Sequence, residues 1–427
     1  MNVNDLQEKI SVLSGAAKYD ASCATSGSSG FNANGSNKFG KTLPMGVCHS
    51  WTQDGRCVSL LKVLYSNVCK FDCAYCVNRS SADIKRASFT SKELAELTSE
   101  FYRRNYIEGL FLSSGIFADP DIVMEKMIDT AKTLRTEMGF AGYIHLKLIP
   151  GTGEKMIREA GLWSDRLSVN IELPTDKSLQ CLAPEKSGKV ILGAMNDFSD
   201  ISNEVTQTKK KPVFSPNGKI QTPFFAPAGQ STQLIVGATS EDDRQIINLT
   251  SSLYRKFSLK RVYYSAFIHP GSRESRFDPR LPEAAVPPLV REHRLYQADW
   301  LLRFYHFSAS EILTEADPFL DTHLDPKTAW ALKNLDFFPI EINRADYETL
   351  LRIPGIGAKT ARRIIETRRS RNLTMENLHR MGAALKRARY FMTANGSFIE
   401  RPDDPARIRR LLSDTDGAGL QLPLFDF

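Results

Sequence analysis

The sequence predicts an α/β protein, a partial (β/α)6 TIM-like barrel followed by a small all-α domain. The prediction rests on two observations, the alternation of strand and helix patterns in the body of the chain and a separate basic region near the C-terminus. Between residues 58 and 306, six short apolar runs alternate with helical patterns, which is typical of βα units that form a parallel sheet. Six units are too few for a closed eight-stranded barrel but enough for a partial one. Positive charge, in contrast, is concentrated near the C-terminus.

The apolar runs place the candidate strands at 58–65, 107–113, 143–149, 167–173, 233–239 and 261–268. Within 167–173, Ser168, Asn170 and Glu172 share one face, because side chains alternate along a strand. His145 and Lys147 do the same within 143–149. Polar side chains on a buried strand need a polar partner. We therefore expect a ligand in the barrel lumen, the alternative being a satisfied polar network.

Composition sets the class of protein. The chain is 42% hydrophobic and 25% charged, and no run approaches the roughly 18 apolar residues of a membrane span. Seven cysteines without an export signal favour metal or redox chemistry over disulfides. We expect a soluble, cytoplasmic protein with no membrane partner.

At 427 residues the chain is too long for one ordinary domain. Gly- and Ser-rich stretches precede the first strand, and turn signals dominate a long insertion in the barrel. The expected segments are an irregular N-terminal wrap (1–57), the barrel (58–306) with its insertion (184–230), a linker (307–340), a helical domain (341–396) and a tail (397–427).

Three cysteines lie close together in "SNVCKFDCAYCVNRSS", directly after the first strand. Structural zinc and ferredoxin-type clusters take four protein ligands. The three thiols of Cys69, Cys73 and Cys76 can instead hold one corner of a [4Fe-4S] cluster and leave one iron open. The alternative is that they are packing cysteines.

This CxxxCxxC spacing resembles the radical SAM superfamily. The resemblance implies that the three cysteines bind a [4Fe-4S] cluster whose open iron binds S-adenosylmethionine (SAM). It also implies reductive cleavage to a 5′-deoxyadenosyl radical and an electron donor such as a flavodoxin or ferredoxin. By the same resemblance, the residues at the SAM contact positions are Tyr75, Ser113, Ser114, Gly115, Ser168, Asn170, Glu172 and Gly237. The segment at 113–115 lacks the family's usual glutamate, and no residue is assigned to the reaction on the substrate.

The other cysteines are Cys23, Cys48, Cys57 and Cys181. Their spacing fits no standard site, so they predict either an auxiliary metal site or buried inert thiols. The stretch "REHRLYQADWLLRFY" (291–305) predicts a helix. Its polar side chains either face substrate or cofactor or form ion pairs around a core of Leu295, Leu301 and Leu302.

The C-terminal region is basic, since residues 341–411 contain 16 Lys and Arg against 8 Asp and Glu. Its segment "INRADYETLLRIPGIGAKTARRIIETRRS" (342–370) predicts two helices joined by a Gly-rich turn, and it resembles the helix-hairpin-helix of DNA-repair proteins. Backbone N–H groups of such a turn can approach a phosphate. The resemblance assigns DNA binding to Pro354, Gly355, Ile356, Gly357, Ala358, Lys359 and Thr360. Residues 377–396 look like a degenerate second copy, and an αα-hairpin used only for packing is the alternative.

The last residues, "GLQLPLFDF", resemble the short peptide by which bacterial repair and replication proteins bind the DNA sliding clamp. The matching residues are Gln421, Leu422, Leu424 and Phe425, with Pro423 in place of the usual Ser or Asp.

Nearly the whole chain, including "KYDASCATSGSS", "PAGQSTQLIVGAT" and "VREHRLYQADWLLRFY", resembles bacterial DNA modification/repair radical SAM proteins. These are often encoded beside a uracil-DNA-glycosylase-like partner. The resemblance implies a radical SAM enzyme that acts on duplex or damaged DNA. Two alternatives remain: a radical SAM enzyme that modifies RNA, and a DNA-tethered iron-sulfur protein with a redox or structural cluster.

Overall fold

The computed structural model describes residues 3–17, 47–51, 57–209, 225–270, 278–283, 288–397 and 404–416. The chain divides into two compact units. The first comprises residues 1–241 and 252–288, and the second comprises residues 242–251 and 289–427.

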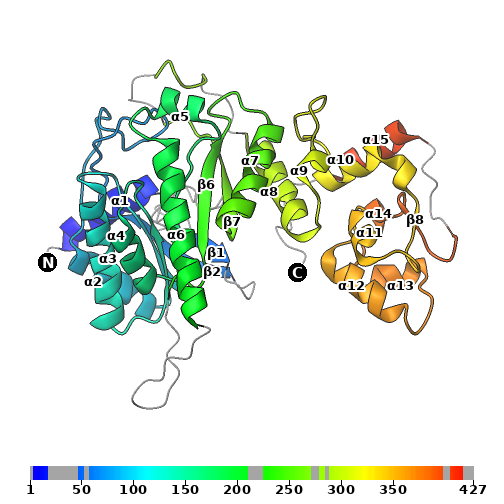
Figure 1. Ribbon diagram of the computed structural model, residues 1–427, viewed down its shortest axis with the longest axis horizontal. Helices are drawn as coiled ribbons and strands as arrows, with labels where there is room; N and C mark the ends of the chain where they lie inside the picture. Colours follow the sequence, from blue (N-terminus) through cyan, green and yellow to red (C-terminus); the bar gives the residue numbers. More distant parts are fainter. Residues whose placement is uncertain are drawn as a thin grey trace, which may run out of the picture. The chain divides into compact units, whose positions relative to one another are not determined.

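A seven-stranded sheet forms the centre of the first unit (Figure 1). The strands are β1 (Val47–Trp51), β2 (Cys57–Leu64), β3 (Gly109–Ser113), β4 (Tyr143–Lys147), β5 (Arg166–Ser168), β6 (Gln230–Val236) and β7 (Arg261–Ala266). They follow one another in chain order, with β1 antiparallel to β2 and all later pairs parallel. Strands β2 to β7 form a curled half-barrel, which confirms the predicted partial barrel. Their carboxyl ends meet at one edge, where such folds bind ligands.

All six predicted strands occur, with shifted ends. The largest difference is β5, which has three residues and ends at Ser168. Beyond it, Glu172 makes only an isolated bridge to Leu234, and its φ of 67° lies in the left-handed region. A non-glycine residue in that region breaks the regular alternation of a strand.

Helices cover one face of the sheet (Figure 1). They include α2 (Ser91–Arg103), α3 (Pro120–Thr136), α4 (Glu154–Trp163) and α6 (Gly188–Lys209). The short helix α5 (Asp176–Leu182) precedes α6, and the residues of α7 (Asp243–Phe257) are divided between the two units. Local sequence starts them: Thr90 and Glu93 form a capping box at α2, and Asp119 caps α3 ahead of Pro120. No helix in the described residues is long and apolar enough to cross a membrane.

Two segments that were expected to be irregular contain regular structure. The expected wrap at 1–57 includes α1 (Val3–Ala17) and β1. The expected insertion at 184–230 begins with α6, a helix of 22 residues. The prediction failed there because the prolines that suggested turns lie outside α6, whose buried Ile191, Met195 and Phe198 follow helical spacing.

The second unit is mainly helical. Its elements are α8 (Leu289–Phe304), α9 (Ala309–Ile312), α10 (Pro326–Lys333), the 3-10 helix η1 (Leu335–Phe337), α11 (Tyr347–Arg352), α12 (Ala358–Thr367), α13 (Met375–Arg380), α14 (Leu385–Ala388) and α15 (Pro405–Asp416), with a two-stranded sheet of β8 (Ile340–Glu341) and β9 (Met392–Thr393).

The expected linker at 307–340 was wrong. It holds α9, α10 and η1 around Trp330, whose ring centroid lies 5.2 Å from that of Phe307 and 5.8 Å from that of Phe337. These elements are too short to leave a clear periodic pattern in the sequence.

Gly109 is where the sheet is least tolerant of a side chain. A Cβ added there would lie 2.2 Å from the Tyr143 carbonyl oxygen and 2.7 Å from Leu60 Cδ2, both on strands paired with β3. Because these strands must separate, we expect Gly109→Ala to lower the free energy of unfolding by about 1–3 kcal/mol. Urea denaturation followed by circular dichroism measures this. Gly193→Ala, with no atom within 4 Å of the added Cβ, is the matched control and should be neutral or stabilising. Equal losses in both variants would contradict the prediction.

Candidate functional site

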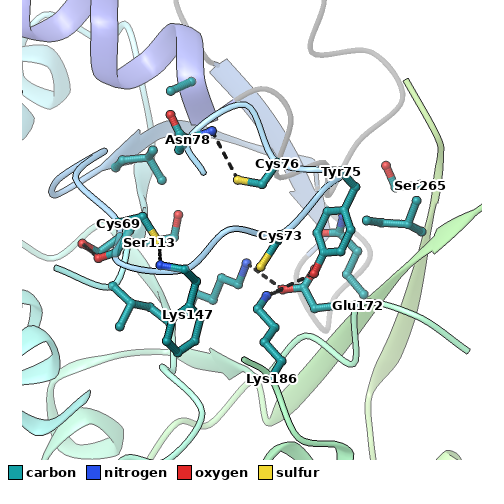
Figure 2. Close-up of a pocket in the computed structure, with 18 of the residues that line it drawn as sticks. Cys69, Cys73, Tyr75, Cys76, Asn78, Ser113, Lys147, Glu172, Lys186 and Ser265 are labelled. Atoms are coloured by element: carbon teal, nitrogen blue, oxygen red, sulfur yellow. Dashed lines mark hydrogen bonds and ion pairs between the residues drawn. The ribbon is translucent and has the colours of Figure 1, made fainter. Parts of the chain in front are cut away.

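The three clustered cysteines lie on the loop that follows β2, which we call the cluster loop (residues 65–90). Cys69, Cys73 and Cys76 all line one pocket at the carboxyl edge of the barrel (Figure 2). Cys73 is buried, and the other two are half-buried. The fold therefore brings the predicted cluster ligands to the edge where a parallel half-barrel binds its ligands.

Arg86 fixes the shape of the cluster loop. One guanidinium nitrogen donates to the carbonyls of Asn67 and Asn78 at 2.6 and 2.9 Å. The other donates to the carbonyls of Arg79 and Ala82 at 2.6 and 3.0 Å. Four backbone groups on both sides of the thiols thus share one rigid, permanently charged partner.

Backbone N–H groups point at two of the sulfurs. Phe71 donates to Cys69 Sγ at 3.5 Å, and Asn78 donates to Cys76 Sγ at 3.4 Å. Burial raises the pKa of Cys73, and it raises the pKa of Cys76 to about 12. Burial therefore favours the protonated thiol at Cys73 and Cys76, and a metal that binds these two sulfurs must displace their protons.

The donor set fits a cluster better than a single ion. In the described residues, no group of three His, Cys, Asp or Glu side chains is arranged to hold one metal ion. A [4Fe-4S] cluster needs no such convergence, because each thiolate binds a different iron. The pocket lining includes no fourth Cys and no His among the described residues. Three thiols with two N–H···S bonds are consistent with a cluster that keeps one iron open.

The pocket contains some of the residues at the predicted SAM positions and not others. Those that line it are Tyr75, Ser113, Ser114, Gly115 and Glu172. The Oγ of Ser113 is buried and has no hydrogen-bond partner in the described residues, so it can donate to a ligand. Gly115 packs so closely on the cluster loop that an added Cβ would lie 2.4 Å from the Val68 carbonyl oxygen.

Ser168, Asn170 and Gly237 are not in the pocket lining. Asn170 donates to Gln233 Oε1 at 3.5 Å, and both Ser168 and Asn170 are buried. Gly237 has a φ of 86° and lies against Pro288. Ser168 and Asn170 do not line the pocket with Glu172 because the regular strand β5 ends at Ser168. The left-handed backbone at Glu172 turns that side chain alone toward the pocket.

Two lysines join the site: Lys147, which the sequence placed on a polar strand face, and Lys186, which it did not assign. Lys186 Nζ lies 3.0 Å from Glu172 Oε1 and donates to the Tyr75 hydroxyl at 3.2 Å (Figure 2). Lys147 Nζ lies 3.7 Å from the same carboxylate oxygen. Burial disfavours the charge on Lys186, but Glu172 outweighs it and the pKa of Lys186 stays well above its ordinary value. The alternation in β4 pointed to Lys147, whereas no local signal marked Lys186.

The first helix-hairpin-helix consists of α11, the turn at 353–357 and α12. Gly355 has a φ of 83°, and a Cβ there would lie 2.6 Å from the Ala384 carbonyl oxygen. That oxygen belongs to a second hairpin, formed by α13, the turn at 381–384 and α14, which matches the expected degenerate copy. Ala384 N–H donates to the Gly355 carbonyl at 2.9 Å, and Thr360 Oγ1 donates to the Gly382 carbonyl at 3.4 Å. The two hairpins therefore hold each other through their turns.

This packing sorts the predicted DNA-binding residues. Pro354, Ile356 and Thr360 are buried, and the Thr360 hydroxyl is used by the second hairpin. Gly357 caps α12 without any side-chain cap, and no acidic residue lies in the first turn. Gly355, Gly357 and Ala358 are half-buried and Lys359 is exposed. The start of α12 can thus offer backbone N–H groups and one lysine to an anion.

A buried lysine supports the first turn from behind. Lys327 Nζ donates to the Ile356 carbonyl at 2.6 Å and lies 4.5 Å from the centroid of the Tyr305 ring. Burial lowers the pKa of Lys327 to about 7, although Asp325 opposes this.

Several predicted residues cannot be placed. The clamp-binding peptide, Gln421, Leu422, Leu424 and Phe425, lies outside the described residues, as does Cys23. The backbones of Cys48 and Cys57 belong to β1 and β2, but their side chains are not among those described. Cys181 is exposed at the end of α5.

Replacing Arg86 tests whether its four hydrogen bonds hold the cluster ligands in place. We expect Arg86→Lys, which cannot reach four carbonyls at once, to weaken iron binding by roughly 10- to 100-fold. Iron content and cluster absorbance after anaerobic reconstitution measure this. Arg135→Lys is the matched control, because Arg135 also holds two carbonyls, those of Phe140 and Gly142, away from the thiols. Unchanged iron binding in Arg86→Lys would show that the cluster loop does not need the four hydrogen bonds of Arg86 to hold the thiols.

Lys327 predicts a pH dependence of stability. The folded chain releases its proton near pH 7, whereas the unfolded chain holds it up to an ordinary lysine pKa of about 10.5. Because the unfolded state then binds more protons, we expect the second unit to become more stable as pH rises from 7 to 10. Thermal unfolding at both pH values measures the effect. Lys327→Met should abolish the increment, and the exposed Lys386→Met should leave it intact. A decrease in stability over this range in the wild type would rule the explanation out.

Two family models match parts of the chain. One is described as a 4Fe-4S single cluster domain and matches residues 54–160, which include all three cysteines of the cluster loop. The other is described as a SAM-like helix-hairpin-helix tandem and matches residues 323–370, which include the first hairpin. No curated protein matches the sequence.

Several solved structures are similar at a low level. The FeFe-hydrogenase maturase HydG from Carboxydothermus hydrogenoformans is 13% identical, with 56% of this chain and 49% of that chain covered and a TM-score of 0.39. Methylornithine synthase (PylB) is 12% identical, with 56% and 60% covered and a TM-score of 0.40. A radical SAM methyltransferase from Sphaerobacter thermophilus is 12% identical, with 61% and 75% covered and a TM-score of 0.37.

The matched region thus spans less than two thirds of the maturase and of the synthase, and similarities this low assign no activity. The family models carry the conclusion instead. The chain joins a 4Fe-4S domain, whose thiols line the barrel pocket, to a helix-hairpin-helix domain.

Proposed function

We propose that this protein is a radical SAM enzyme that uses a 5′-deoxyadenosyl radical to repair or modify DNA. The observation that carries the proposal is the combination in one chain of two features. Three thiols line a pocket at the carboxyl edge of a parallel half-barrel. A basic pair of hairpins follows in the same chain, and the N-cap residue of its helix α12 is a glycine, which has no side chain to cap it.

The pocket supports the cofactor part of the proposal. Cys69, Cys73 and Cys76 would hold the cluster, and with three protein ligands it would keep one position for S-adenosylmethionine. When bound and reduced, the cluster supplies the electron that cleaves the sulfonium.

The chain's own residues bind and orient the cofactor. Tyr75 lies between the last two thiols in sequence, and Lys186 holds its hydroxyl. Lys186 and Lys147 lie beside the Glu172 carboxylate, whose oxygens can accept hydrogen bonds from a ribose. The free Ser113 Oγ can bind the methionine end of SAM.

The second unit supports the choice of nucleic acid as substrate. Residues 341–411 carry twice as many basic as acidic residues, 16 against 8, and the start of α12 offers backbone N–H groups. Such contacts bind any sequence, so the target must be selected at the barrel. A base inside a duplex must leave the stack to reach a pocket, and a damaged base leaves it most easily.

Partners follow from this chemistry. The cluster needs a one-electron donor such as a flavodoxin or ferredoxin. The tail resembles a sliding-clamp peptide, and a uracil-DNA-glycosylase-like protein is a second candidate partner. Both would bring the enzyme to sites of repair.

The proposal predicts that the reconstituted, dithionite-reduced protein releases 5′-deoxyadenosine from SAM. Cys73→Ala should abolish this release, because its iron loses a buried ligand. The matched control is Cys181→Ala, which removes an exposed thiol and should leave cleavage unchanged. Anaerobic chromatography of the nucleoside product, with and without duplex DNA or folded RNA, measures both chemistry and preference.

Three outcomes would change the conclusion. Cleavage stimulated by RNA and not by DNA would favour an RNA-modifying enzyme. No cleavage from an intact, reduced cluster would favour a DNA-tethered redox or structural protein. Unchanged cleavage in Cys73→Ala would contradict the assignment of the ligands.

A further inference from the structure

The helix α8 leaves apolar side chains exposed and buries charged ones. Its exposed residues are all apolar: Leu289, Val290, Trp300 and Phe304. Its buried residues are three apolar ones, Leu295, Ala298 and Leu301, and three charged ones, Glu292, Arg294 and Asp299. A helix on a protein surface normally turns its polar side to water. Exposed apolar side chains opposite buried charges indicate a surface that binds something.

The buried polar groups lock α8 in this orientation. Arg294 donates to the carbonyls of Asp321 and Thr322, each at 3.1 Å, and to Gln297 Oε1 at 2.9 Å. Asp299 accepts from Arg303 Nε at 2.9 Å. Rotating the helix to bury its aromatic residues would break the two hydrogen bonds from Arg294 to the Asp321 and Thr322 carbonyls, which lie outside α8.

Trp300 and Phe304, which we call the aromatic pair, form the exposed end of this face. They are 40% and 41% exposed, and their ring centroids lie 4.3 Å apart at an angle of 44°. The Arg303 guanidinium lies 4.7 Å from the Phe304 centroid and steadies that ring. The pair is therefore a preformed aromatic surface rather than two mobile side chains.

The aromatic pair adjoins the start of α12 through Tyr305. The Tyr305 hydroxyl is hydrogen-bonded by the Trp300 side chain and by the Ala358 backbone. A Cβ added at Gly357, the N-cap of α12, would lie 3.2 Å from that hydroxyl. One hydroxyl group thus separates the Trp300 indole from the turn to which we assign phosphate binding.

We propose that the aromatic pair stacks on an unpaired or terminal base of the nucleic acid whose phosphate lies on the first hairpin. This inference rests on the proposed function, because it takes the hairpin as the phosphate site. The basic charge of the region favours a polyanion over a protein as the occupant. Bases inside a duplex stack on one another and have no free ring face. An aromatic surface on the protein therefore selects a base with one unstacked face.

The test compares three fluorescent DNAs of one sequence at one salt concentration: a blunt duplex, the duplex with a single-stranded overhang, and the duplex with one unpaired internal base. Full-length protein is titrated against each, and anisotropy gives the Kd. We expect the wild type to bind the two DNAs with unpaired bases more tightly. Trp300→Leu with Phe304→Leu should weaken that binding by about 5- to 150-fold, the range of one stacked base, and leave the blunt duplex unchanged.

Two variants serve as controls. Phe319→Leu removes another exposed aromatic ring of the same unit, 55% exposed, and should change nothing. Lys359→Ala removes a phosphate contact and should weaken all three DNAs by a similar factor. The single variant Trp300→Phe keeps an aromatic ring and should retain most of the preference, which separates stacking from folding defects.

Several results would overturn the inference. If the double variant binds all three DNAs as the wild type does, or loses affinity equally for all, the pair does not stack on a base, although the hairpin assignment stands. If light scattering shows that the double variant abolishes self-association, the pair is a protein interface. If neither the wild type nor Lys359→Ala binds any of the DNAs, the DNA part of the proposed function fails together with the inference.

Discussion

Four backbone carbonyls of the cluster loop converge on the guanidinium of Arg86, and the placement of the thiols depends on this convergence. A long connection between a strand and a helix has few partners of its own, and buried carbonyls without donors are costly. An arginine can satisfy several at once because its donors are fixed in one plane. With the loop fixed, the three sulfurs and the carboxyl ends of the strands share one pocket, and Glu172, Lys147 and Lys186 complete its polar side.

What the sequence could predict is local. Strands repeat every two residues and the thiols are neighbours, so six strands and the cluster ligands follow from short windows of sequence. The ion pairs of Lys186 are not local, since its partners Tyr75 and Glu172 come from other elements. The grouping of Ser168 and Asn170 with Glu172 assumed an unbroken strand, and the left-handed backbone at Glu172 ends that assumption. At 184–230 the composition predicted an irregular insertion, because several prolines lie beyond residue 209. The residues before them form a long helix, α6.

The hairpins show how a weak sequence copy acquires a structural role. The second hairpin bonds to the first at two points. Its Ala384 N–H donates to the Gly355 carbonyl, and its Gly382 carbonyl accepts from the Thr360 hydroxyl. Residues that look like phosphate ligands in one motif therefore include some that hold the pair together. Within the first hairpin, we assign polyanion binding to the backbone at the start of α12 and to the exposed Lys359.

The antiparallel strand β1 has a consequence for solubility. A half-barrel, unlike a closed one, leaves strand edges whose free N–H and C=O groups can pair with another molecule. The five residues of β1, Val47–Trp51, pair along β2 and cover the edge of the sheet on the β2 side. Because β1 runs against the direction of the other strands, it can do so without a crossover helix. A chain shortened to begin after Trp51 would keep Cys69, Cys73 and Cys76 and would expose the edge of β2, and we expect it to aggregate.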